Sequence, residues 1–220
     1  MNYWNEEVYG KKLQWNIWPF TEVISTLLSA KPDCEELNKE ILEIGCGVGN
    51  NLIPIAQLGY NVHGIDISDL AIQEAKRRAT EQNVRADLIC GNVTTLPYES
   101  NFFSHVIDRS VLTCTTPDVI IQAIDEIFRV LKPGGIFMAF DWFGINHPDL
   151  KFGECVMRNV YCGFSDGRFK NVEFITSFDL EALGKYFNKF KNLKVRRIVS
   201  SDEGGKLLSE TFNFIAMKPN

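Results

Sequence analysis

The sequence predicts an α/β domain in which helices cover both faces of a mostly parallel β-sheet. Three observations lead to this fold class. Short apolar runs alternate with segments of helical period between residues 40 and 141, a glycine-rich turn follows the first run, and polar residues end the next ones. Parallel neighbours need a long crossover connection, so strands that alternate with helices favour a parallel sheet covered on both sides.

The elements of this alternating region follow one another closely. A first helix is expected over residues 21–30, where Lys31-Pro32 ends it. In a later helix, Ser68 suits the N-cap and Asp69 lies in the first turn, where the helix dipole favours an acidic residue. The strands are expected at 41–44, 61–67, 87–90, 103–108 and 136–141, and the helices between them at 51–58, 68–82 and 117–131.

The pattern changes after residue 141. Residues 142–177 hold Gly, Asn, Pro and scattered aromatic residues without a clean period. This stretch is too long for an ordinary connection and is predicted to form a cap over a site. A helix is then expected at 179–190, followed by strands at 193–200 and 208–217. The turn chemistry between these two strands predicts a hairpin, so the last strand should be antiparallel at the sheet edge.

Composition narrows the class of protein. The chain has 220 residues, 45% of them hydrophobic, and a formal charge of −5. It contains no run of about 18 apolar residues and its start lacks the features of a signal peptide, so we expect no membrane partner and a cytoplasmic location. The six cysteines have no metal-ligand spacing and are expected to be reduced thiols without a metal site. The basic clusters 76–78 and 194–197 are expected to be solvated faces, and nucleic acid is not expected as a partner.

The most informative segment is the turn that contains Gly45, Gly47 and Gly49. Glycine tolerates positive φ and lets another molecule approach the backbone, and the helix that follows presents free N–H groups. Asp66 lies at the end of the next expected strand, where its carboxylate could accept both ribose hydroxyls; the alternative is a capping or exposed aspartate. These features predict a nucleoside-like cofactor.

Three further residues extend this site. Glu43 sits in an apolar strand, where an unpaired charge is costly, so it belongs either to a core network or to a ligand contact. The Asn92 side-chain oxygen could accept from an exocyclic amine and the Val93 N–H could donate to a ring nitrogen, as in adenine recognition. The alternative for Asn92 is an asparagine chosen for its turn.

Five ordered segments together resemble the class I S-adenosylmethionine-dependent methyltransferases over residues 40–141; they are Glu43–Gly49, Gly64–Asp66, Gly91–Val93, Val106–Asp108 and Val130–Gly135. The resemblance implies a Rossmann-like seven-stranded sheet of order 3-2-1-4-5-7-6 with the last strand antiparallel. It also implies S-adenosyl-L-methionine as cofactor, with the glycines near the methionine part, Asp66 on the ribose, and Asn92 and Val93 on the adenine. The family more often has aspartate at the position of Asn92. The expected cofactor-binding set is Glu43, Gly45, Cys46, Gly47, Gly49, Asp66, Ile67, Asn92, Val93, Asp108 and Arg109.

The segment Asp108-Arg109-Ser110-Val111-Leu112 is similar to the Asp-Arg-x-x-Leu segment of thiopurine-methyltransferase-like members of this class. That similarity implies that Asp108 lies near the methionine ammonium or the transfer site. The alternative is a structural role at the end of a strand.

Candidates on the acceptor side are fewer. Asp141 and His147 are the expected catalytic groups, although His147 could be a surface residue. Trp15, Trp18 and Trp142 are the expected substrate contacts. Trp15 and Trp18 precede the first helix, where an aromatic face beside a sulfonium is favourable, and Trp142 belongs to the cap, whose aromatic residues could enclose a planar or apolar substrate. The alternative for the first two is packing of the first helix onto the sheet. Likewise, the aromatic residues of the cap either enclose a substrate or form the cap's own small core.

These observations predict one domain: an N-terminal aromatic and helical cover (1–36), a cofactor-binding core (37–141), a substrate cap (142–177) and a C-terminal helix and hairpin (178–220). The expected function is methyl transfer to a small-molecule acceptor by in-line displacement, with the oligomeric state left open. One alternative is a binding subunit without catalysis. The other is a nicotinamide-dependent oxidoreductase, whose Gly-x-Gly-x-x-Gly spacing this chain lacks.

Overall fold

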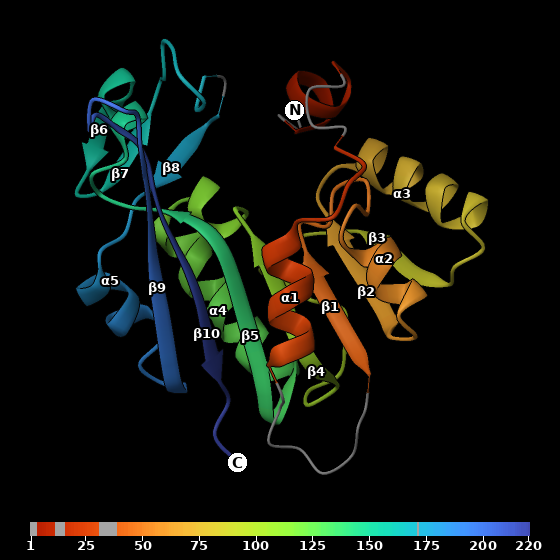
Figure 1. The fold of residues 1–220 in the computed structure, drawn as a ribbon. Coiled ribbons are helices and arrows are strands. Elements are labelled where there is room, and N and C mark those ends of the chain that lie inside the picture. The colour runs from red at the N-terminus through yellow and green to blue at the C-terminus, as the bar shows by residue number, and fades with distance from the viewer. Residues whose placement is uncertain (1–3, 12–15, 31–38, 171) are drawn as a thin grey trace.

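A seven-stranded sheet of order β3-β2-β1-β4-β5-β10-β9 organises the molecule (Figure 1). The computed structural model describes residues 4–11, 16–30, 39–170 and 172–220. Neighbouring strands from β3 to β5 pair in parallel, whereas β10 is antiparallel to both β5 and β9. The predicted order and the antiparallel orientation of the last strand are therefore confirmed. The expected edge position of the last strand is wrong, because β10 lies between β5 and β9, and β9 forms the edge. The strands of this sheet are β1 (Glu40–Ile44), β2 (Asn61–Asp66), β3 (Ala86–Cys90), β4 (Phe103–Arg109), β5 (Leu131–Phe143), β9 (Lys191–Ser201) and β10 (Leu207–Met217).

Helices pack on both faces of the sheet, as expected. On one face, Ile124 of α4 and Phe187, next to α5, belong to the larger apolar core. On the other face, Leu27 of α1 and Ile72 of α3 belong to a second core. The central strands contribute side chains to both cores, so their sequences are continuous apolar runs. The helical segments are η1 (Trp4–Tyr9), α1 (Thr21–Ser29), α2 (Leu52–Gln57), α3 (Asp69–Glu81), η2 (Leu112–Cys114), α4 (Pro117–Val130), η3 (Pro148–Phe152) and α5 (Leu180–Tyr186).

The cap segment has regular structure that the sequence did not indicate. Three short antiparallel strands form a second sheet of order β6-β7-β8, and η3 precedes it. The strands are β6 (Glu154–Met157), β7 (Val160–Cys162) and β8 (Phe174–Thr176). A small apolar cluster holds this unit together, and it contains Phe143, Leu150, Phe164, Phe169 and Ile175. Aromatic residues of the cap thus form a core of their own, and two of them, Phe143 and Phe169, also line a cavity.

A β-bulge interrupts the end of β5. Pairing with β10 shifts between Phe212 and Phe214, and Asp141 of β5 falls within this shift. Asp141 has a φ of +55°, in the left-handed region. Bulges of this kind change the direction in which the following side chains point. As a result, Trp142 faces the same core as Ala139 and is fully buried there.

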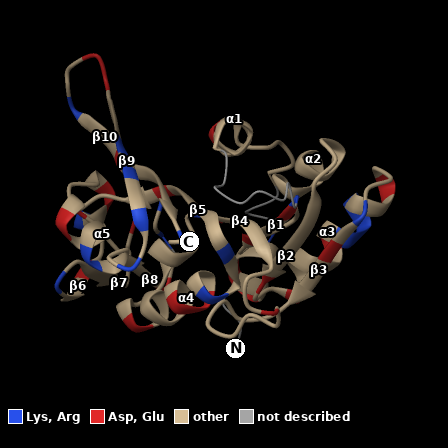
Figure 2. Ribbon diagram, turned by 90° about the horizontal axis from the view of Figure 1, so that it is seen from below, with Lys and Arg blue, Asp and Glu red and all other residues tan. Residues whose placement is uncertain are grey.

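Charged residues of both signs occur together on α3, α4 and α5 (Figure 2). No helix of the described residues is long and apolar enough to cross a membrane. The described cysteines, which exclude Cys34, are free thiols.

Candidate functional site

A cavity of about 1280 Å³ opens at the carboxyl ends of the parallel strands, the position at which α/β sheets bind ligands. The turn after β1 and the ends of β2 and β3 line one end of it. The opposite end is lined by Arg109, Asp141, residues of the cap, and the paired residues Ile198 and Thr211 of the β9–β10 hairpin. The N-terminal segment adds a wall that contains Trp4, Tyr9, Asn16 and Phe20.

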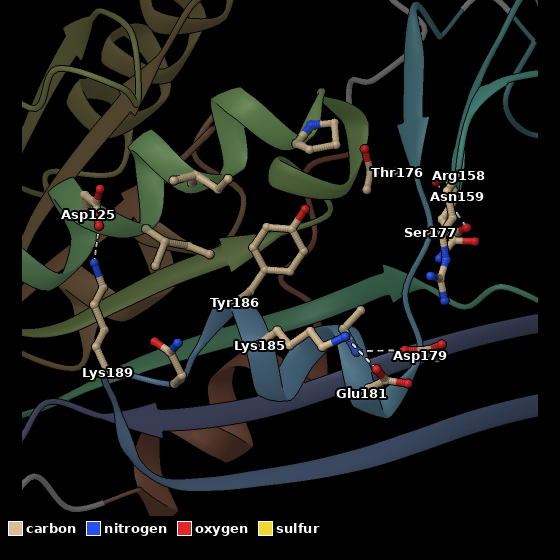
Figure 3. A pocket seen from close by; sticks show the side chains of 15 residues that line it. Asp125, Arg158, Asn159, Thr176, Ser177, Asp179, Glu181, Lys185, Tyr186 and Lys189 are labelled. Atoms are coloured by element: carbon tan, nitrogen blue, oxygen red, sulfur yellow. Dashed lines mark hydrogen bonds and ion pairs between the residues drawn. The ribbon is translucent and has the colours of Figure 1, made fainter.

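A second cavity of about 500 Å³ lies between α4, α5 and the β6–β7 turn (Figure 3). Its lysines pair with acidic residues that also line it: Lys185 with Glu181 at 2.5 Å, and Lys189 with Asp125. None of the predicted site residues lines it. We therefore place the functional site in the larger cavity.

The glycine turn requires glycine for conformation and for space. Gly45 and Gly47 have φ values of +60° and +53°. A Cβ on Gly45 would lie 2.1 Å from Cγ2 of Val111, and one on Gly47 would lie 2.7 Å from the hydroxyl of Tyr9. No side chain therefore covers the backbone of the turn beside the cavity, so a cofactor can lie close to it.

Asp66 is held in place by the same turn. Its Oδ2 accepts a hydrogen bond from the Gly47 N–H at 2.8 Å, and its Oδ1 accepts one from the Ser68 N–H at 2.8 Å. Burial raises the pKa of this carboxyl group, while the N–H donors act against the shift. The side chain lines the cavity. A fixed carboxylate at this point can accept further hydrogen bonds from ribose hydroxyls.

Glu43 presents a buried oxygen that lacks a partner. Its Oε1 accepts a hydrogen bond from Nδ2 of Asn51 at 2.7 Å, whereas its Oε2 is buried without a hydrogen bond in the described part of the chain. Burial raises the pKa of Glu43 to about 8. An orphaned acceptor on a cavity wall is costly unless a ligand donates to it. The ammonium group of a methionine moiety fits that need, so the residues present fit S-adenosyl-L-methionine.

Arg109 and Asp141 form an ion pair on the cavity wall. Nη2 of Arg109 donates to Oδ2 of Asp141 at 2.8 Å, and the Arg109 guanidinium carbon lies 3.4 Å from the ring centre of Phe20. The Phe20 N–H donates to Oδ1 of Asn51 at 3.0 Å, and the same Asn51 side chain donates to Glu43. The two ends of the cavity are thus connected through Asn51 and Phe20.

Most of the expected cofactor residues meet at this cavity. Two do not line it. Gly49 packs toward Ile53 and Ala75, and Asp108 is fully buried. The residues that line it are Glu43, Gly45, Cys46, Gly47, Asp66, Ile67, Asn92, Val93 and Arg109.

Asp108 has internal partners instead of a ligand-facing position. Its Oδ1 accepts from the Val111 N–H at 2.9 Å and its Oδ2 from Nε1 of Trp142 at 2.5 Å. Burial raises its pKa to about 7. The structure therefore corrects the expected contact between Asp108 and the methionine ammonium, because Asp108 is fully buried, does not line the cavity, and joins β4 to η2 and β5.

The structure separates the two expected catalytic residues. Asp141 lines the cavity, whereas His147 is buried in the cap against Phe143 and Phe169 and does not line it. Nδ1 of His147 accepts a hydrogen bond from the Asp149 N–H at 3.2 Å, which places the proton on Nε2. Burial lowers the pKa of His147 to about 4. Its position argues against a role as a catalytic base.

The tryptophans are not where a substrate contact requires them. Trp142 is fully buried in the core, and Trp18 is 72% exposed and does not line the cavity. Trp15 lies outside the described residues. The aromatic residues that do reach the cavity from the N-terminal segment are Trp4, Tyr9 and Phe20, and the aromatic composition of that segment was the available signal.

Arg78 corrects another expectation. It belongs to the basic cluster at 76–78 but is only 7% exposed. Its guanidinium donates to the carbonyl of Val48 at 2.6 Å and to that of Ile17 at 3.0 Å. Arg78 therefore joins the glycine turn to the N-terminal segment. Arg77 is solvated, as expected, and pairs with Glu74 and Glu81.

Four features together define the core of a class I S-adenosylmethionine-dependent methyltransferase. They are the order of the sheet, the glycine turn after β1, Asp66 at the end of β2, and the polar residue that follows β3. The family described as "Methyltransferase domain" matches residues 41–135. These residues are therefore a methyltransferase domain, and the resemblance of the sequence to this class is confirmed. S-adenosyl-L-methionine is the cofactor of that class. The closer likeness of residues 108–112 to thiopurine-methyltransferase-like members stays a prediction.

Curated relatives with different acceptors align with the chain. The tRNA N(3)-cytidine methyltransferase METTL2 of Bos taurus is 31% identical over 170 residues, which cover 72% of this chain and 44% of that protein. The 24-methylenesterol C-methyltransferase 2 of Oryza sativa subsp. japonica is 33% identical over 124 residues, which cover 55% of this chain and 32% of that protein. The chain thus spans less than half the length of either relative.

Solved structures share the fold. A SAM-dependent methyltransferase from Methanosarcina mazei superposes with a TM-score of 0.69 at 22% identity, covering 92% of this chain and 99% of that one. The 1,6-didemethyltoxoflavin-N1-methyltransferase of Burkholderia thailandensis, with S-adenosylhomocysteine bound, superposes with a TM-score of 0.65 at 17% identity, covering 90% and 76%.

The expectation that nucleic acid is excluded as a partner is wrong. It depended on the negative net charge and the short basic clusters. Relatives that align with 72% of the chain are nevertheless tRNA methyltransferases. Net charge reports on non-specific attraction to phosphates and does not exclude recognition of one nucleotide.

Proposed function

We propose that the protein transfers a methyl group from S-adenosyl-L-methionine to an acceptor bound at the Asp141 end of the cavity. The single observation that carries this proposal is that one cavity joins the two halves of such a site. Glu43, Asp66 and the glycine turn lie at one end, and the Arg109–Asp141 pair lies at the other. We also propose a cytoplasmic location. The spacing of the six cysteines in the sequence, which suggests reduced thiols, supports it.

The chemistry asks little of the protein beyond alignment. The bound cofactor supplies a methyl group that is already attached to a good leaving group. The chain must hold the acceptor atom in line with that group and exclude water. Asp141 uses Oδ2 for Arg109, and no hydrogen bond engages its Oδ1 among the described residues. Oδ1 is therefore available to accept a hydrogen that the acceptor carries on or beside its attacking atom.

Two acceptor classes have a specific observation in their favour. A nucleotide of an RNA is supported by the tRNA methyltransferases, whose alignment with 72% of this chain extends well beyond the 41–135 match. A small molecule is supported by the cap, whose Phe143 and Phe169 line the cavity together with the β9–β10 hairpin. Enclosed, aromatic walls of this kind are typical of small-molecule sites.

The test is transfer of a labelled methyl group. The full chain is incubated with methyl-tritiated cofactor and either unfractionated tRNA or a protein-free metabolite extract. Label in the RNA supports the first acceptor class, and label in the small-molecule fraction supports the second. Absence of label from both, in protein that binds the cofactor by calorimetry, would overturn the proposal of catalysis.

Asp141→Asn tests the proposed role of this residue in transfer. The amide keeps the shape of the side chain but is a poorer proton acceptor, so we expect kcat to fall by about tenfold to a hundredfold. Cofactor affinity should stay within about twofold, because Asp141 lies at the acceptor end. The exposed Asp87 of β3 provides the matched control, and Asp87→Asn should leave both values unchanged. An unchanged kcat in Asp141→Asn would remove this residue from the mechanism.

A further inference from the structure

Asp141 has a backbone conformation that residues other than glycine rarely adopt. Its φ is +55°, and Ser110, beside it at the end of β4, has a φ of +58°. Such conformations persist only where the surrounding structure determines them, and they are concentrated at functional sites. The contacts that hold Asp141 therefore matter for the direction of its carboxylate.

The bulge in β5 removes the ordinary partner of the Asp141 backbone. Because the register between β5 and β10 shifts between Phe212 and Phe214, Asp141 has no pairing partner in β10. The side chain of Asn213 takes over this function. Its Oδ1 accepts a hydrogen bond from the Asp141 N–H at 2.9 Å.

Two more side chains complete the support. The Ser110 hydroxyl donates to the Asp141 carbonyl at 3.1 Å, and Arg109 donates to the carboxylate. Asn213 differs from Arg109 and Ser110 in one respect. It is only 7% exposed and does not line the cavity, so it can touch the reacting groups only through Asp141.

We propose that Asn213 is a positioning residue that holds the Asp141 carboxylate in the geometry needed for transfer. This inference depends on the proposed function, because it assigns Asn213 to the acceptor end of that site. Without the Asn213 oxygen, the Asp141 N–H loses its partner and the left-handed conformation loses one of its three supports. The carboxylate then leaves its place beside Arg109 in part of the population.

Amide hydrogen exchange at Asp141 tests the positioning without any acceptor. In Asn213→Ala we expect the Asp141 N–H, followed by NMR, to exchange about tenfold faster than in the unaltered protein. Asn213→Asp retains an accepting oxygen, so its rate should stay within about threefold. Asn188→Ala, at an exposed asparagine that follows α5, is the matched control and should change nothing. Equal exchange rates in all variants would overturn the proposal.

Kinetics then separate positioning from general stability. With whichever acceptor preparation takes up label, Asn213→Ala should lower kcat by about tenfold and leave cofactor affinity within about twofold. Asn213→Asp should restore most of the rate. Adding Asn213→Ala to Asp141→Asn should cause little further loss, because both changes act on one group. Additive losses, or an equal fall in cofactor affinity, would show a merely structural role.

Two further results, a variant that does not fold and an unaltered protein without transfer activity, are treated separately. If Asn213→Ala does not fold, Asn213→Ser is used, since its shorter side chain also leaves the N–H without a partner at that distance. If the unaltered protein transfers label to neither preparation, the proposed function fails, whereas amide exchange still decides whether Asn213 positions Asp141.

Discussion

At the scale of single residues, polar groups at the proposed cofactor end are hydrogen-bonded to the protein's own backbone and side chains. Asp66 uses both carboxylate oxygens on backbone N–H groups, and Glu43 uses one on Asn51. Bonds of this kind fix the direction of a side chain, and fixed side chains lower the cost of ordering on binding. They also mean that a substitution here disturbs the turn as well as the ligand contact.

Asp66→Ala should weaken binding of S-adenosyl-L-methionine by at least about tenfold, since a lost hydrogen bond to a charged group costs about 1.5–3 kcal/mol. Isothermal titration calorimetry measures the change. Asp87→Ala serves as the control, because Asp87 is an exposed acid at the opposite end of the neighbouring strand. Unchanged affinity in Asp66→Ala would remove this residue from the site.

Asp66 and Asp108 show what a single sequence can and cannot reveal at this scale. Asp66 is the last residue of β2 and Asp108 the last but one of β4, so strand order alone brings both to the carboxyl ends of the parallel strands. Trp142 lies 34 positions after Asp108, and the bulge in β5 sets its direction. The sequence could not show that Trp142 would donate a hydrogen bond to the Asp108 carboxylate. Which polar residue faces the ligand depended on a contact between distant segments.

At the scale of elements, the N-terminal segment forms one wall of the larger cavity. The hydrogen bonds from Arg78 in α3 tie the carbonyl of Ile17 to that of Val48 in the glycine turn. Phe20, at the start of α1, bonds to Asn51. The segment is therefore held against the turn from two sides, next to the cavity that it lines.

Arg78→Ala should loosen this attachment. We expect faster hydrogen exchange for residues 16–20 and cofactor binding weaker by about threefold to tenfold, because two charge-assisted bonds to carbonyl oxygens are lost. Exchange mass spectrometry and calorimetry measure the two effects. Arg77→Ala is the matched control, since Arg77 pairs only on the solvated face of the same helix. Equal behaviour of the two variants would contradict the role given to Arg78.

Element positions were predictable where the local pattern was strong. The helical period of α4 and the glycine turn that follows β1 predicted the bounds of α4 and β1 almost to the residue. The cap was less predictable. β6 is exposed along its whole length, so it lacks the alternation of a half-buried strand. The expected helix at 179–190 is shorter in the structure, where it spans Leu180–Tyr186 with Phe187 at its C-cap.

At the scale of the whole molecule, buried acids make folding stability depend on pH. The pKa of Glu43 is about 8 in the folded protein, against an ordinary value of 4.5, and that of Asp108 is about 7 against 3.8. Between the ordinary and the raised values, the folded state holds a proton that the unfolded chain has released. Stability must therefore fall as pH rises through this window.

Glu43→Gln should remove part of this dependence. Gln keeps the acceptor oxygen for Asn51 but does not titrate. Relative to the unaltered protein, the variant should gain up to about 2 kcal/mol in free energy of unfolding between pH 6 and pH 8, from about 1.36 kcal/mol per unit of pH. Urea unfolding of cofactor-free protein at both pH values measures the difference. Glu203→Gln, in the exposed turn between β9 and β10, should show no such gain.

The overall architecture was the most predictable level. Seven strands in the expected order follow from alternating elements and a terminal hairpin, together with the family resemblance. The lining of the acceptor end was not predictable. Ile198 and Thr211 pair with each other where β10 runs beside the end of β5, and nothing in their local sequence marks them as cavity residues.

The two ends of the described chain have unequal tolerance to attachment. η1 lies near the carboxyl ends of the parallel strands, where the cavity is. The last residues after β10 lie at the opposite end of the sheet (Figure 1). An affinity tag or an immobilising linker attached beside Trp4, which lines the larger cavity, would therefore stand close to the proposed binding site. Surface-plasmon or single-molecule studies should fix the protein to its support through Asn220.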